Sequence, residues 1–185
     1  MAGDPSDDLD ERGLRALAAL LRVRHAIDDE IAVLIGTTPT PGHVGEAVAA
    51  AVFGIELASS GVNPGFDGIF RSGPLTGRTV NVKTYAERTG LLDISPHPCD
   101  WYLVLMGPPR ASSEKGRSLP FRVEQVFLFD IGALRASLVA ARVGVGVASS
   151  IRKAFWDAAR LYPEQAPGLP LALDDGQRRR LALFA

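Results

Sequence analysis

Four polar residues in the stretch 42–85 have side chains that could together perform metal-dependent chemistry on a phosphate ester. Oxygen ligands are what magnesium and manganese prefer, and a lysine beside the metal can stabilise negative charge on a reacting phosphate. The stretch contains two carboxylates, Glu46 and Asp67, followed by the amide of Asn81 and the ammonium group of Lys83. We interpret Glu46, Asp67 and Asn81 as candidate ligands of Mg²⁺ or Mn²⁺, and all four residues as candidate catalytic groups.

The elements predicted around these residues place three of them on one face of a hairpin. Alternating side chains predict strands over 66–70 and 79–85, joined by a loop that contains glycine and proline. Successive side chains of a strand point to opposite faces. With the aromatic and valine side chains turned to the core, Asp67, Asn81 and Lys83 project together to the other side.

Glu46 is expected on a buried helix. It is the only charged residue in the segment 42–53, whose other residues are almost all small or apolar. A helix that is apolar all round is usually buried, and a buried carboxylate needs a partner or an opening to solvent. Glu46 reaches the other three residues if its helix crosses the open end of the hairpin. A salt bridge or a contact in the first helical turn is the alternative explanation.

The remaining sequence predicts an α/β domain with extra helices at both ends. Residues 101–106 (WYLVLM) form a continuous apolar run, which is typical of a strand buried on both faces. A long N-terminal helix, which Ser6 could cap, ends at a glycine. We expect an N-terminal helical segment over 1–41, a core over 42–163 and a C-terminal tail over 164–185. Further helices are predicted over 7–35, 130–141, 151–161 and 177–184, and further strands over 55–57, 121–129 and 143–147.

Composition limits the compartment and the partners. The chain has 185 residues, of which 46% are hydrophobic and 22% charged, with a net charge of -1. This balance gives no general attraction to nucleic acid, so DNA binding would need a local basic face. Cys99 is the only cysteine, which excludes an internal disulfide and a cysteine-based zinc site. With no signal peptide and no apolar run long enough to span a membrane, we expect a cytoplasmic protein without a membrane partner.

The order of the predicted elements resembles the core of the PD-(D/E)xK, or restriction-endonuclease-like, nuclease superfamily. On this resemblance, Glu46 corresponds to the glutamate that many members carry on the first helix. Asp67 then corresponds to the motif aspartate and Lys83 to the motif lysine. Asn81 stands where the superfamily usually has Asp or Glu, so a charge is missing and the expected metal affinity falls. The resemblance covers about residues 42–106 and implies a mixed central β-sheet flanked by helices.

Several strings are more specifically similar to an uncharacterised bacterial family that is restriction-endonuclease-like by fold. This second similarity extends over most of the chain. It implies that Asn-x-Lys is the family's own form of the motif, and it implies no activity. The strings are IDDEIAVLIG, GHVGE, DGIFRSGPLTGRTVNVK, LLDI and WYLVLMGP.

These observations lead to two functional hypotheses. The first is a magnesium- or manganese-dependent endonuclease acting on DNA, whose retained catalysis depends on Asn81. The second is a catalytically inactive module of the same fold that binds nucleic acid or a protein partner. A homodimer is compatible with both, since many nucleases of this fold pair to cut two strands. Plain structural roles remain open: Asp67 as a turn residue, Lys83 as a solvated lysine and Asn81 as a cross-strand partner.

Overall fold

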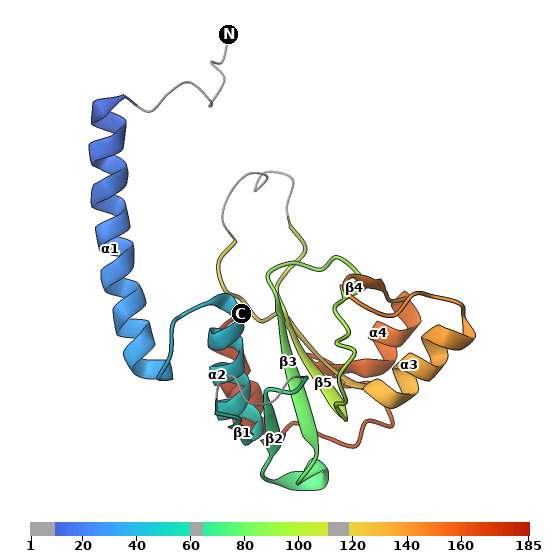
Figure 1. The fold of residues 1–185 in the computed structure, drawn as a ribbon. Helices are drawn as coiled ribbons and strands as arrows, with labels where there is room; N and C mark the ends of the chain where they lie inside the picture. The colour runs from blue at the N-terminus through green and yellow to red at the C-terminus, as the bar shows by residue number, and fades with distance from the viewer. Residues whose placement is uncertain (1–9, 60–64, 111–118) are drawn as a thin grey trace. The chain divides into compact units, whose positions relative to one another are not determined.

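The chain divides into two compact units in the computed structural model, which describes residues 10–59, 65–110 and 119–185 (Figure 1). The first unit is Met1–His43 and the second is Val44–Ala185. The division between them falls two residues after the boundary at residue 41 that we predicted. The first unit is built mainly of one helix, and the second contains the sheet and the candidate site residues.

The helix of the first unit is α1 (Glu11–Ile35), and residues at both ends explain its limits. At the start, the Gly13 N–H donates to Asp10 Oδ1 at 2.7 Å, which satisfies an amide that has no partner inside the helix. At the end, Gly36 adopts a left-handed conformation with φ of 74°. The glycine end was predicted, whereas the predicted cap Ser6 lies outside the described residues.

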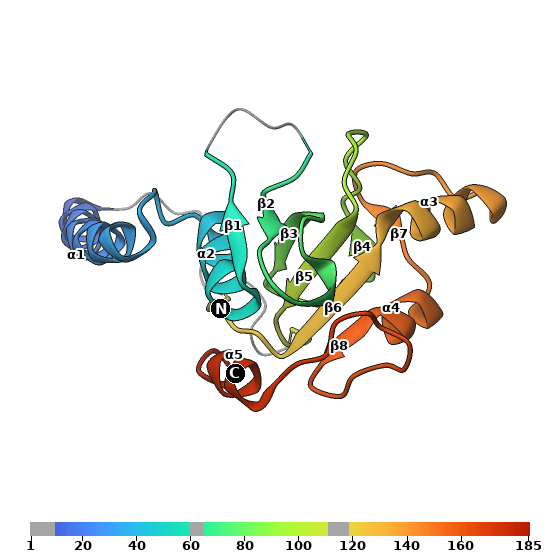
Figure 2. The ribbon, with the colours of Figure 1, turned by 90° about the horizontal axis from the view of Figure 1, so that it is seen from below.

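A mixed β-sheet forms the centre of the second unit, as predicted (Figure 2). Its six strands in the described residues follow the order β1-β2-β3-β5-β6-β8, and β4 and β7 form a separate two-stranded ribbon. β3 and β5 pair in parallel, and all other neighbouring strands are antiparallel. The strands are β1 (Ile55–Leu57), β2 (Gly68–Phe70), β3 (Thr79–Tyr85), β4 (Leu91–Leu92), β5 (Trp101–Met106), β6 (Gln125–Asp130), β7 (Ser149–Ser150) and β8 (Arg160–Tyr162).

Helices cover both faces of the sheet. The helices that pack on it are α2 (Pro41–Phe53), α3 (Ile131–Ala140), α4 (Lys153–Ala159) and α5 (Asp175–Ala182). Buried side chains of α2 and α5 pack with Val80 and Val82 on one face. Those of α3 and α4 pack around Tyr102 and Phe127 on the other. The α/β class with a helix-flanked mixed sheet is therefore confirmed. No described helix is both long and apolar enough to cross a membrane.

The strands closest to the candidate site match the predictions best. β3 and β5 have the predicted limits, and every residue of β5 after Trp101 is buried. β2 is shorter than predicted and begins at Gly68. A short 3₁₀ helix, η1 (Gly73–Leu75), lies in the loop that joins β2 to β3.

Two predictions near the C-terminus are wrong. Part of the helix predicted over 151–161 is instead strand β8, because this segment pairs with β6 and that pairing outweighs the local helical pattern. Residues 143–147 form no strand; Ser149 and Ser150 pair with β4 instead. In the segment predicted as a C-terminal tail, Leu171 and Leu181 are buried in the main core.

Candidate active site

Asp67 lies directly before β2, at the point where this strand separates from β3. Its backbone remains part of the sheet, since its N–H donates to Val80 O at 2.9 Å and its carbonyl accepts from the Ala58 N–H at 2.8 Å. Its side-chain Oδ2 accepts a hydrogen bond from the Val82 N–H at 2.7 Å. The carboxylate thus satisfies an amide of β3 beyond the end of the β2–β3 pairing, and this bond holds the side chain in place.

Asn81 is almost fully buried in the middle of β3, with 7% of its surface exposed. Its Nδ2 donates to the Gly65 carbonyl at 3.2 Å, which ties it to the backbone just before Asp67. Its Oδ1 is buried and has no hydrogen-bond partner among the described residues. A buried oxygen without a partner costs free energy, so this atom needs an explanation. A bound cation would supply the missing interaction.

Gly65 allows the close packing that buries Asn81. A Cβ at this position would lie 2.5 Å from His97 Cβ and 3.2 Å from the Pro98 carbonyl. The residue also has a backbone φ of 115°, which residues other than glycine rarely adopt. Gly65 therefore lies directly against the chain before β5 and next to the Asn81 side chain.

Lys83 shares the Asn81 face of β3 and interacts electrostatically with Asp67. Its Nζ lies 5.5 Å from the centre of the Tyr102 ring, on the face opposite α2. Burial raises the pKa of Asp67, and the Val82 N–H and the Lys83 charge act in the opposite direction. The structure thus brings Asp67, Asn81 and Lys83 into one small region of β2 and β3.

Glu46 approaches this region from the other face of the sheet. Gly45 lies against β3, since a Cβ on it would be 1.8 Å from Thr84 Oγ1. Glu46 is the next residue of α2 and is half-buried. Its carboxylate would have to pass around the edge of β3, beyond the end of β2, to reach Asp67. Helix α2 therefore packs on the face of the sheet opposite Lys83.

A pocket of about 610 Å³ opens beside Lys83. Its lining includes Lys83, Asp93 and residues 145–147. Two tyrosines hold one wall in position: Tyr85 OH accepts the Asp93 N–H at 3.0 Å, and Tyr102 OH accepts the N–H two residues later at 2.9 Å. The chain between β3 and β5 is thereby fixed across the Lys83 face of the sheet.

Arg135 is a second cation in this pocket and was not among the predicted site residues. It comes from α3 and lines the pocket together with Lys83. Its Nη2 donates to the carbonyls of Ser95 and His97, the latter at 3.3 Å. No local sequence signal marks Arg135, because only the packing of α3 against the sheet brings it near β3.

Two arginines that flank the site in sequence are paired with acids. Arg71 forms an ion pair with Glu56 of β1. Arg78 forms one with Asp100 at 3.4 Å. Because each charge is already compensated in part, these arginines are weaker candidates for phosphate contacts than Lys83 and Arg135.

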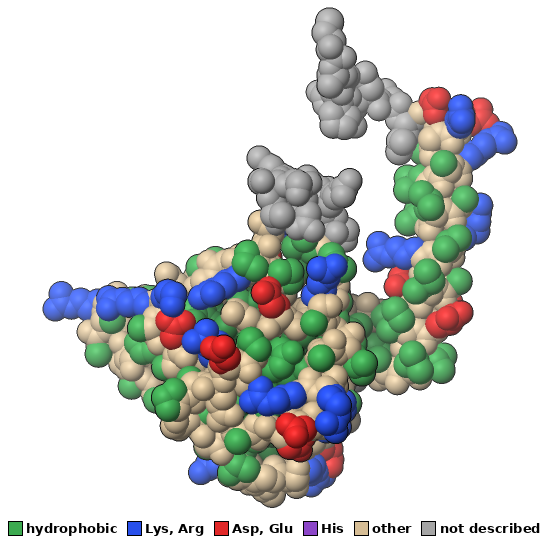
Figure 3. Space-filling model, turned by 180° about the vertical axis from the view of Figure 1, so that it is seen from behind, with side chains coloured by type: hydrophobic (Ala, Val, Ile, Leu, Met, Phe, Trp, Pro, Cys, Tyr) green, Lys and Arg blue, Asp and Glu red, His purple; other side chains and the backbone are tan. Residues whose placement is uncertain are grey.

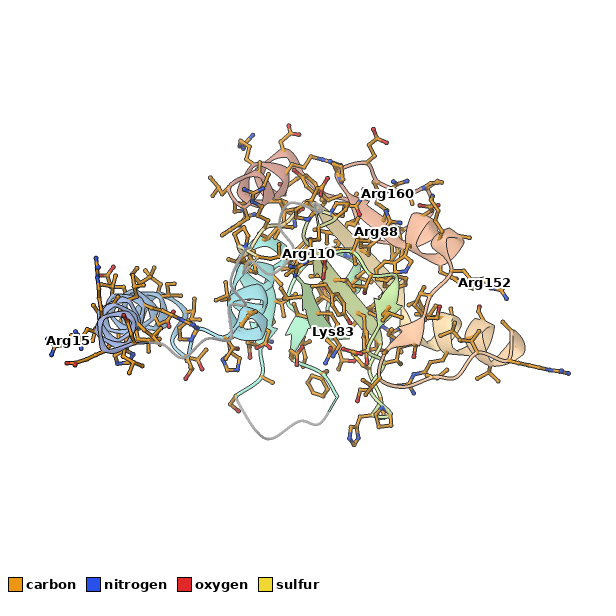
Figure 4. All side chains as sticks on the ribbon, turned by 90° about the horizontal axis from the view of Figure 1, so that it is seen from above. Arg15, Lys83, Arg88, Arg110, Arg152 and Arg160 are labelled. Atoms are coloured by element: carbon orange, nitrogen blue, oxygen red, sulfur yellow. The ribbon has the colours of Figure 1, made fainter. Side chains whose placement is uncertain are left out.

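Arg88, the third flanking arginine, belongs to a different group of charges. It and Arg160 both interact electrostatically with Asp157 of α4. Figure 4 shows Lys83 apart from Arg88 and Arg160. We therefore leave Arg88 outside the candidate site.

The donor set favours a weak cation site over a strong one. Among the described residues, no group of three or more His, Cys, Asp or Glu side chains is arranged to hold a metal ion. The nearest arrangement combines one carboxylate, Asp67, with the amide oxygen of Asn81. These oxygens fit a hard cation such as Mg²⁺, but with less negative charge than two carboxylates would supply.

We expect Asp67→Asn to stabilise the protein at neutral pH. Because the folded state raises the pKa of Asp67 above its ordinary value of 3.8, ionisation of Asp67 destabilises the fold as pH rises through the folded-state pKa. Below pH 3.8 the carboxyl is protonated in both states and this cost disappears. Asparagine keeps an acceptor for the Val82 N–H without the charge. Thermal unfolding followed by circular dichroism should show a gain in Tm at neutral pH that fades in acid.

The control for this prediction is the exposed substitution Asp130→Asn, at a helix cap away from Asp67. It should not reproduce the pH-dependent gain. An Asp67→Asn protein less stable than the parent at neutral pH would show that the attraction to Lys83 and Val82 outweighs the cost of burial.

Comparison of the sequence with protein-family models and with curated proteins found no match.

Proposed function

We propose that this chain is a restriction-endonuclease-like protein that hydrolyses phosphodiester bonds of DNA with magnesium or manganese. The observation that carries the proposal is the grouping of Asp67, Asn81 and Lys83 where β2 leaves β3. The strand order is consistent with it, since three antiparallel strands are followed by a parallel strand, β5. A helix carrying Glu46 also precedes the first of these strands.

Each residue has a separate role in the proposed reaction. The Asp67 carboxylate and Asn81 Oδ1 would hold the cation, and Glu46 would complete the set from around the β3 edge. The cation would act as a Lewis acid on the phosphate and position the attacking water. The water oxygen forms a bond to phosphorus and gives up a proton, the bond to the leaving sugar oxygen breaks, and that oxygen takes up a proton. Lys83 stabilises the negative charge that develops on the phosphate.

Arg135 would bind a neighbouring phosphate of the same strand. It and Lys83 line one pocket, whose only carboxylate in its described lining is Asp93. The Asp93 Oδ1 already accepts the Ala148 N–H at 2.7 Å, which reduces its competition for the cations. Two cations in one pocket suit a polyanionic backbone, although the chain as a whole carries a charge of -1.

Asn81→Asp is the sharpest test of the metal site. If Asn81 Oδ1 faces a bound cation, a carboxylate there should tighten Mg²⁺ and Mn²⁺ binding about tenfold, equivalent to about 1.4 kcal/mol. Isothermal titration calorimetry of the parent and the variant measures this change directly. The variant loses the hydrogen bond from Nδ2 to Gly65, so its Tm should be recorded alongside.

The matched control is Asn81→Ala, which removes both the amide oxygen and the bond to Gly65. It should bind metal more weakly than the parent. Equal metal binding by the parent and both variants would remove Asn81 from the site. Plasmid and single-stranded DNA left intact by the parent and by Asn81→Asp, in either metal, would overturn the nuclease proposal.

A second candidate function is a catalytically inactive module that binds nucleic acid or a protein partner. The amide at position 81 and the small number of carboxylates in the site favour it. Such a module would retain labelled DNA in a binding assay without metal and without cleavage. Loss of binding in Arg135→Ala would then place the DNA in the pocket described above.

A further inference from the structure

The helix of the first unit carries apolar side chains that it cannot bury by itself. None of the residues of α1 is buried, and Figure 3 shows hydrophobic side chains exposed along it. Most of the stability of a protein helix comes from packing of its apolar face. We call one row of residues along α1 the seam; four of them are apolar, and Arg24 and Asp28 stand at its centre. The seam residues alternate in steps of four and three, which is the repeat of paired helices. They are Leu17, Leu21, Arg24, Asp28, Ile31 and Ile35.

The two charges at the centre of this seam define how a partner can fit. Arg24 and Asp28 form an ion pair of 3.4 Å within the helix. They lie at equal distances along the chain on either side of Ala26, with Leu21 and Ile31 at equal distances beyond them. The order of apolar and charged positions is therefore the same when the seam is followed from either end, except that Arg24 and Asp28 change places.

We propose that α1 pairs with α1 of a second copy of this chain in an antiparallel arrangement. A two-fold axis beside Ala26 places Arg24 of one copy opposite Asp28 of the other, and the reverse. The same axis places Leu21 opposite Ile31, so apolar contacts flank the charges. A parallel pair would instead set Arg24 against Arg24 and Asp28 against Asp28. Charge complementarity thus selects the antiparallel dimer, and the central charges set its register.

Sedimentation equilibrium of the full chain tests whether the seam makes a dimer. We expect the parent to sediment as a dimer and Ile31→Glu as a monomer, because a carboxylate would enter the apolar part of the seam. The matched control Val33→Glu changes the opposite side of α1 and should remain dimeric. A monomeric parent, or a dimer that Ile31→Glu leaves intact, would overturn the proposal. Unchanged circular dichroism would show that Ile31→Glu is folded.

Charge exchange tests the contact between Arg24 and Asp28. Arg24→Glu and Asp28→Arg should each weaken the dimer at least about tenfold, since each places like charges together twice. Mixing the two variants should restore dimers, because each copy then meets an opposite charge. Failure of the mixture to form dimers would contradict the contact.

Disulfide cross-linking determines the orientation. In a Cys99→Ser background, Leu21→Cys and Ile31→Cys proteins should cross-link when mixed and should do so poorly alone. Efficient cross-linking of Leu21→Cys with itself would indicate a parallel pair and overturn the antiparallel arrangement. None of these measurements depends on cleavage, so the dimer and the nuclease proposal can fail separately.

Discussion

Lys83→Ala should lower the rate of metal-dependent DNA cleavage by about 100- to 1,000-fold, the usual effect of removing one group that stabilises transition-state charge. Lys83 lies on the same face of β3 as Asn81, and its charge acts on Asp67. Removing it should also raise the pKa of Asp67 further, since the positive charge favours the ionised carboxylate. The residual activity should therefore need a higher pH. Plasmid cleavage measured across pH gives both results.

Arg152→Ala is the matched control for this prediction. Arg152 is exposed and lies away from Lys83 (Figure 4). Its removal lowers the positive charge by the same amount but should leave the cleavage rate within about twofold, because a distant exposed charge is screened by salt. A Lys83→Ala protein that cuts as fast as Arg152→Ala would remove Lys83 from the catalytic site.

Trp156→Ala should cause the largest loss of stability among single changes on the α4 side of the sheet. Trp156 is 1% exposed and makes edge-to-face contacts with Phe127 and Phe129, with ring centres 4.8 Å and 5.0 Å away. Truncation of a buried tryptophan costs about 3–5 kcal/mol, because it removes apolar contacts and leaves a cavity. Urea unfolding followed by far-ultraviolet circular dichroism measures this loss.

Trp156→Phe separates the ring contacts from the indole N–H. The Nε1 atom is buried and has no hydrogen-bond partner among the described residues, so its removal relieves an unsatisfied donor. The phenylalanine variant should lose less than about 1.5 kcal/mol. If both variants lost the same free energy, the packing of the two neighbouring phenylalanine rings would not be what stabilises this face.

The local pattern of the sequence was sufficient to predict the limits of β3 and β5, and to predict which side chains of the β2–β3 hairpin share a face. In these strands the apolar residues either alternate or run continuously, and each pattern reports burial directly. The common face of Asn81 and Lys83 follows from the same alternation. The restriction-endonuclease-like fold and the activity remain proposals, because alternation identifies faces and carries no information about chemistry.

Contacts between distant segments decided the rest. Strand β8 forms because residues 160–162 meet β6, and no local pattern encodes that meeting. Arg135 joins the pocket of Lys83 only through the packing of α3. Helix α2, which carries Glu46, packs on the face of the sheet opposite Lys83, where Gly45 fits against Thr84. A sequence specifies which face of each element is apolar, whereas the side of the sheet that each helix covers depends on how all the elements pack together.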